Sequence, residues 1–98
     1  MSLSLIWYFL IGALLGNGFP HFIWGVSKTI AKSPFGQKSK PIVNLRWGLS
    51  NFIVATILSI WQITQNTITE ESFTALLVGF WLMIAMFGFG INNFLNEP

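Results

Sequence analysis

The chain has 98 residues, of which 53% are hydrophobic and only 8% are charged, and its formal net charge is +2. Soluble domains have about 25% charged residues, so this composition excludes a water-soluble domain and predicts an integral membrane protein. The absence of cysteine and aspartate, together with a single histidine, excludes a disulfide framework, paired-carboxylate catalysis, a catalytic triad and a multi-ligand metal site.

The first apolar stretch covers residues 3–26 and is long enough to cross a hydrocarbon core of about 30 Å as a helix. It begins without a basic residue, so we expect a membrane span rather than a signal peptide. Pro20 lacks the N–H that would bond the carbonyl of Gly16, which predicts a kink or break. Asn17 and His21 lie one turn apart beside it. This segment is either a ligand site in an interrupted helix, as in transporters, or a kink that only shapes packing.

The connection that follows, residues 27–41, carries four lysines and no acid. Its sequence Ser33-Pro34-Phe35-Gly36 is typical of a turn. The lysines are Lys28, Lys32, Lys38 and Lys40. We expect them to lie against anionic lipid headgroups, and the alternative is a docking site for a soluble partner or an acidic ligand.

The second apolar stretch covers residues 42–64. At 100° per residue, four of its small or amide side chains fall on a stripe about 60° wide. These are Asn44, Gly48, Asn51 and Ala55. Small residues allow another helix to approach closely, and amides can bond across the contact. Arg46 points to nearly the opposite side, where we expect it to reach the headgroups; the alternative is a contact with an anionic ligand.

The third apolar stretch covers residues 73–91. Ala75, Gly79, Met83, Met86 and Gly90 form one stripe that is suited to helix packing. Phe73, Phe80, Phe87 and Phe94 repeat every seven residues, and we expect this ridge to face lipid or another subunit. Trp81 lies deep in the span, where we expect it to be packed rather than interfacial.

Charge in the two connections predicts the orientation. Basic loops stay in the cytoplasm, whereas residues 65–72 carry Glu70 and Glu71 and no basic residue. We therefore expect the basic loop and the C-terminus inside, and the acidic loop and the N-terminus outside. The predicted fold is all-α, a single transmembrane domain over residues 1–98 with three transmembrane helices.

Antiparallel packing would bring the polar groups of the first two spans to similar depth. Because unpaired amides in hydrocarbon are costly, we expect these groups to gather around the carbonyl of Gly16. The candidate ligand-binding residues are Gly16, Asn17, His21, Asn44 and Asn51. Arg46 would join them only if the second helix unwinds near Pro41 or another subunit faces it.

Several of these motifs occur together in a known group of proteins. The sequence GNGFPHF at residues 16–22 followed by Gly25, SPFG at residues 33–36, and VNLRWGLSNF at residues 43–52 resemble short bacterial membrane proteins of uncharacterised function. The similarity covers about residues 16–52, and the third span adds little. The resemblance implies a bacterial inner-membrane location and no particular activity.

The function that these features favour is a homo-oligomeric channel or carrier for a small anionic or neutral solute. Three helices cannot easily enclose an aqueous path, so a pore would form between subunits. The spans contain no carboxylate, which disfavours cation selectivity. The alternative is a structural or accessory subunit of a membrane complex, and a holin-like pore former is less favoured. We expect no enzymatic activity, metal, cofactor or nucleic-acid partner.

Overall fold

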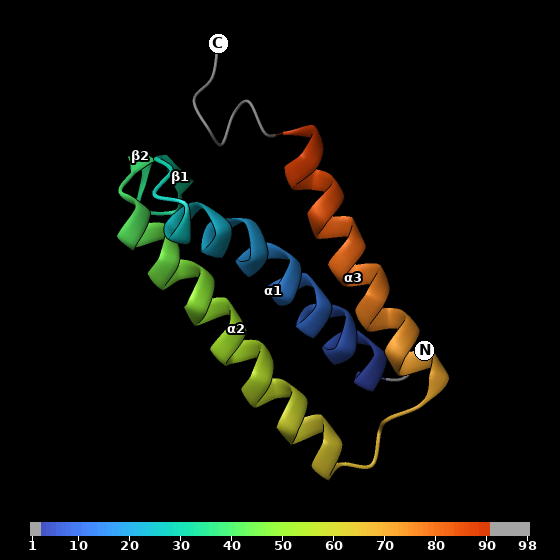
Figure 1. Cartoon of the computed structure of the whole chain (residues 1–98). Helices are drawn as coiled ribbons and strands as arrows, with labels where there is room; N and C mark the ends of the chain where they lie inside the picture. Colours follow the sequence, from blue (N-terminus) through green and yellow to red (C-terminus); the bar gives the residue numbers. More distant parts are fainter. Residues whose placement is uncertain (1–2, 91–98) are drawn as a thin grey trace.

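The structure, a computed structural model, describes residues 3–90. Residue 91 of the predicted third span, Phe94 and the C-terminus lie outside this range. In chain order the elements are α1 (Leu3–Val26), β1 (Ala31–Ser33), β2 (Gly36–Ser39), α2 (Pro41–Thr64) and α3 (Glu70–Phe89). All three helices are long and apolar enough to cross a membrane, and they run side by side in Figure 1. The predicted fold class, a multi-pass helical membrane protein, is therefore confirmed.

The helix bounds agree with the predicted spans at most ends. α1 remains helical through Pro20, so the helix is not broken there. α2 begins with Pro41 in its first turn, where the missing N–H is not needed. α3 begins at Glu70, earlier than predicted, because Thr69 and Ser72 form a capping box. The Ser72 N–H donates to Thr69 Oγ1 over 3.0 Å, and the Thr69 N–H donates to Ser72 Oγ over 2.7 Å.

The basic connection contains a short antiparallel hairpin that the sequence did not predict. β1 pairs with β2, and the predicted turn lies between the two strands. The hydroxyls of Ser33 and Ser39 are 2.5 Å apart, and Ser33 Oγ also accepts from the N–H of Phe35 over 3.1 Å. These side-chain bonds close the turn. The strands are too short to produce a readable alternation in the sequence.

The three helices form a layer with α1 in the middle. α1 packs against both α2 and α3, which scarcely contact each other, as Figure 1 shows. Glycines allow this on both sides of α1. A Cβ on Gly12 would lie 1.8 Å from the carbonyl oxygen of Leu76 in α3. On the other side, a Cβ on Gly48 of α2 would lie 2.8 Å from the carbonyl oxygen of Gly18. Backbone therefore meets backbone at both interfaces.

Burial along α3 differs from the prediction. Trp81 is 64% exposed, so the expectation that it is packed is wrong for a single chain. Phe73 is 61% exposed, whereas Phe87 is only 7% exposed, so the phenylalanines do not share one environment. Phe87 packs with Trp24 and Ala31 at the hairpin end of the bundle. This end of the molecule carries the candidate site.

Candidate functional site

His21 and Asn44 form a buried hydrogen-bonded pair between α1 and α2. His21 is 2% exposed, and its Nδ1 lies 2.5 Å from Asn44 Oδ1. Asn44 Nδ2 donates over 3.0 Å to the carbonyl oxygen of Ala31 in the hairpin. A carbonyl only accepts, so this bond fixes the orientation of the Asn44 amide and leaves its oxygen to face His21. His21 Nδ1 is therefore assigned the proton, and in a neutral ring Nε2 is then an acceptor.

Asn17 and Asn51 form a second pair, in which a backbone carbonyl again orients the asparagine of α2. Asn51 Nδ2 donates over 2.8 Å to the carbonyl oxygen of Trp47, which fixes the orientation of the Asn51 amide. Asn51 Oδ1 then accepts from Asn17 Nδ2 over 3.0 Å. The remaining polar atom of Asn17 is its carbonyl oxygen, an acceptor. The structure thus brings both candidate residues of α1, Asn17 and His21, to a partner on α2, as expected from their positions along the two helices.

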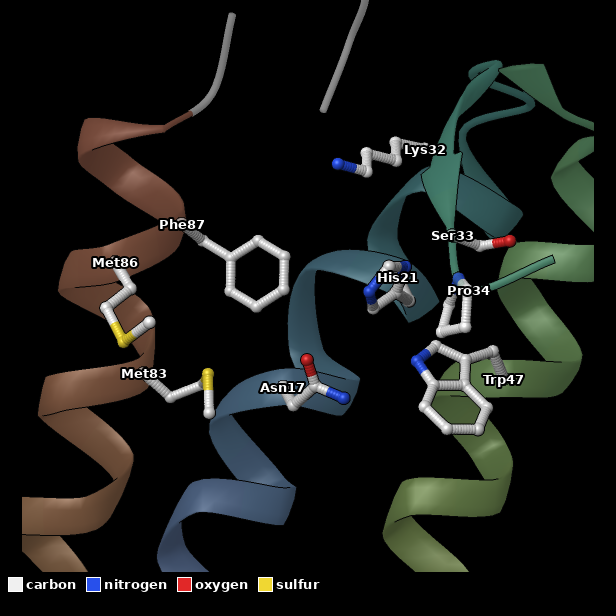
Figure 2. Close-up of a pocket in the computed structure, with 9 residues that line it drawn as sticks. All are labelled: Asn17, His21, Lys32, Ser33, Pro34, Trp47, Met83, Met86 and Phe87. Carbon is white, nitrogen blue, oxygen red and sulfur yellow. The ribbon is translucent and has the colours of Figure 1, made fainter. Parts of the chain in front are cut away.

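A cavity of about 440 Å³ lies beside these two pairs. It is lined by Asn17, His21, Lys32, Ser33, Pro34, Trp47, Met83, Met86 and Phe87. In Figure 2 the Asn17 oxygen and one His21 ring nitrogen point into it, and Lys32 extends over its hairpin end. The indole nitrogen of Trp47 lies on the same side, is buried, and has no hydrogen-bond partner within residues 3–90.

The cavity exists because α2 and α3 flank α1 without meeting across it. α1 provides the polar floor, α3 provides Met83, Met86 and Phe87, and the hairpin closes one end. The His21 ring is held edge-on between two aromatic rings, with centroid distances of 5.2 Å to Trp24 and 5.4 Å to Phe87. These contacts and the hydrogen bond to Asn44 together hold the imidazole ring in its orientation.

The other predicted ligand-binding residues lie outside the cavity lining. Asn44 and Asn51 stand behind His21 and Asn17 and orient them. Gly16 is buried against α3, where a Cβ would lie 2.8 Å from the carbonyl oxygen of Phe80, so it serves helix packing. Arg46 is exposed and lines a separate depression with neighbours from α2 and the hairpin, as its position on the helix predicted.

The lysines of the connection occupy different environments. Lys28, Lys38 and Lys40 are exposed, and Lys32 is half-buried at the cavity. A role in binding headgroups stays a prediction for all four. Among the described residues, no three histidine, cysteine or acidic side chains gather as metal ligands.

The sequence reasoning missed the walls of the cavity. Trp47 lies one turn before Asn51, and a signal for it existed, since Asn51 was recognised as facing α1. Phe87 and the hairpin residues carried no such signal, because their places depend on how α3 and the hairpin dock.

Comparison with protein-family models, curated proteins and solved structures finds no match to this chain. The resemblance to short bacterial membrane proteins therefore stays a prediction.

Proposed function

We propose that this protein is a homo-oligomeric carrier or channel of the bacterial cytoplasmic membrane, and that it binds a small anionic or neutral solute in the cavity beside His21. One observation supports this above all: the Asn17 side-chain oxygen and a His21 ring nitrogen point into one cavity, and the buried indole N–H of Trp47 on the same side has no hydrogen-bond partner within residues 3–90. A buried polar group without a partner costs about 1–3 kcal/mol, and a ligand can supply the missing bond to the indole. The cavity volume of about 440 Å³ falls within the usual size of small-molecule sites.

The close helix contacts favour a path between copies rather than within one. α1 touches both neighbours through glycine, so a water-filled path inside one chain would have to separate these contacts. The outer face of α3, where Trp81 is 64% exposed, is available to a second copy. In this proposal the hairpin lies on the cytoplasmic side with its lysines at anionic headgroups. The protein acts by binding and not as an enzyme.

The test is solute flux in liposomes that contain the purified protein. Chloride, nitrate, glycerol and urea are compared for the wild type, Asn17→Leu and Thr56→Val. Thr56 is exposed, and its hydroxyl bonds only the carbonyl of Phe52, so it is the matched control. We expect the wild type to carry at least one solute faster than protein-free liposomes do, and Thr56→Val to carry it at the same rate. Asn17→Leu should reduce this flux about tenfold, which corresponds to a loss of about 1.4 kcal/mol in binding free energy. Background flux for all four solutes would refute transport of this class.

A further inference from the structure

Two backbone carbonyls determine which side-chain atoms of the cavity's floor accept hydrogen bonds. The Ala31 carbonyl orients Asn44 and thereby puts the His21 proton on Nδ1, and the Trp47 carbonyl orients Asn51 and thereby puts the Asn17 oxygen toward the cavity. His21 Nε2 and Asn17 Oδ1 are consequently both acceptors. Neither group can reverse its role without breaking a bond to a carbonyl.

Two acceptors side by side discriminate between ligand classes. A carboxylate or halide would meet two lone pairs and no proton from these groups, and the ammonium group of Lys32 lies at the hairpin end of the cavity rather than beside them. An ammonium ion could donate, but none of the described residues that line the cavity is acidic, so its charge would be desolvated without compensation. A hydroxyl can donate its proton to one acceptor without bringing any charge. Its oxygen can then accept from the indole N–H of Trp47, which has no partner.

The side walls are mostly apolar, and Lys32 and Ser33 line the hairpin end of the cavity. Met83, Met86 and Phe87 of α3 face Pro34 and the Trp47 ring across the cavity, as Figure 2 shows. Unbranched methionine side chains adapt to ligands of varied shape. Because α2 and α3 scarcely contact each other, an apolar chain attached to the hydroxyl can leave the cavity toward the surrounding lipid.

We propose that the cavity selects an uncharged amphiphile with a terminal hydroxyl, which donates its proton to His21 Nε2 while its apolar chain lies along Met83 and Met86. This inference rests on the proposed function and narrows the solute from anionic or neutral to neutral and hydroxylated. The indole N–H is covered in the structure, so its bond to the hydroxyl oxygen requires a shift of the side chains that cover it.

The test measures binding of four probes with the same chain length: 1-octanol, octane, octanoate and octylamine. The full-length protein is ¹⁵N-labelled in lipid nanodiscs, and the indole N–H resonance of Trp47 is assigned with Trp47→Phe. Each probe is titrated as a mole fraction of the lipid, so that simple partitioning gives a linear shift and site binding gives a saturating one. We expect saturation with 1-octanol at a mole fraction about tenfold lower than for the other probes, the factor that one hydrogen bond supplies.

A matched pair of variants locates the binding. His21→Phe keeps an aromatic ring but removes the nitrogen that accepts the hydroxyl proton, so it should weaken 1-octanol binding about tenfold. Thr56→Val, on the exposed side of α2, should bind as the wild type does. If His21→Phe does not fold, the comparison of the four probes on the wild type still tests the proposal. Equal linear shifts for all probes, saturation with octane as tight as with 1-octanol, or tighter binding of octanoate or octylamine would each overturn the proposal.

The two proposals fail separately. Saturable 1-octanol binding without solute flux in liposomes would remove the transport function and keep the ligand class. Flux of chloride or nitrate without 1-octanol binding would keep the transport function and remove the ligand class.

Discussion

Alanine at Gly12 is predicted to force α1 and α3 apart. A Cβ at this position would lie 1.8 Å from the carbonyl oxygen of Leu76 and 2.9 Å from the backbone nitrogen of Phe80. Both are main-chain atoms of α3, so no side-chain rotation relieves the overlap. Adding a methyl group to a well-packed interior costs about 1–3 kcal/mol. Because the helices themselves must move, we expect Gly12→Ala to lie near the upper end, at about 3 kcal/mol.

Gly88 of α3 provides the control for this substitution. A Cβ there would meet no atom within 4 Å, and alanine is intrinsically about 0.8–1.0 kcal/mol better than glycine in a helix. We therefore expect Gly88→Ala to be as stable as the wild type or slightly more stable. The free energy of unfolding is measured by circular dichroism in mixed micelles as the fraction of sodium dodecyl sulfate is raised. The reasoning is refuted if Gly12→Ala unfolds at the wild-type detergent fraction, or if both variants are destabilised equally.

Two further predictions concern orientation and assembly. In intact cells, an impermeant thiol reagent should label Gln65→Cys, in the exposed loop before α3, and should not label Gln37→Cys, in the exposed hairpin strand β2; the reverse pattern would invert the orientation. By mass measurement in mild detergents and in nanodiscs the protein should be a homo-oligomer, because the outer face of α3 exposes Phe73 and Trp81; a monodisperse monomer in every condition would contradict this.

The contact face of α2 could be predicted because it depends on local geometry alone. Helical periodicity placed Asn44, Gly48, Asn51 and Ala55 on one stripe, and these four residues are buried in α2. The cost of leaving an amide unpaired in hydrocarbon then predicted that they would meet the polar residues of α1. The prediction needed no knowledge of which helix lies in the middle of the layer.

The environments along α3 could not be predicted in this way. Phe73 and Phe87 lie on nearly the same side of the helix, since fourteen residues bring a straight α-helix back to within about 40°. One is nonetheless 61% exposed and the other 7% exposed, because only Phe87 meets aromatic rings of α1, those of His21 and Trp24. Local periodicity gives the direction of a side chain, whereas its burial depends on what another segment places opposite.

The buried position of Asn44 leads to the prediction that tests the whole site. Asn44 is fully buried and joins α1, α2 and the hairpin through His21 and the carbonyl of Ala31. Asn44→Leu would leave a buried N–H and a buried carbonyl without partners, at about 1–3 kcal/mol each, so we expect a loss of at least about 2 kcal/mol in the free energy of unfolding. Ser50→Ala on the same helix removes only an exposed hydroxyl bonded to the carbonyl of Arg46 and should change this free energy by less than about 0.5 kcal/mol.

A loss of stability in Asn44→Leu would not show whether the hydrogen bonds of Asn44 or only its packing matters. The ¹⁵N spectrum of the His21 ring distinguishes the two, because it reports which ring nitrogen carries the proton. In the wild type near neutral pH, Nδ1 should be protonated and Nε2 unprotonated, because the Ala31 carbonyl fixes the Asn44 amide, which in turn accepts from Nδ1. In Asn44→Leu this constraint is gone, and the share of the ring protonated at Nε2 should rise. A wild-type ring protonated at Nε2 would remove the acceptor from the cavity floor, and the selectivity for a hydroxyl would lose its basis. The position of one proton therefore connects the packing of the two helices to the chemistry of the ligand.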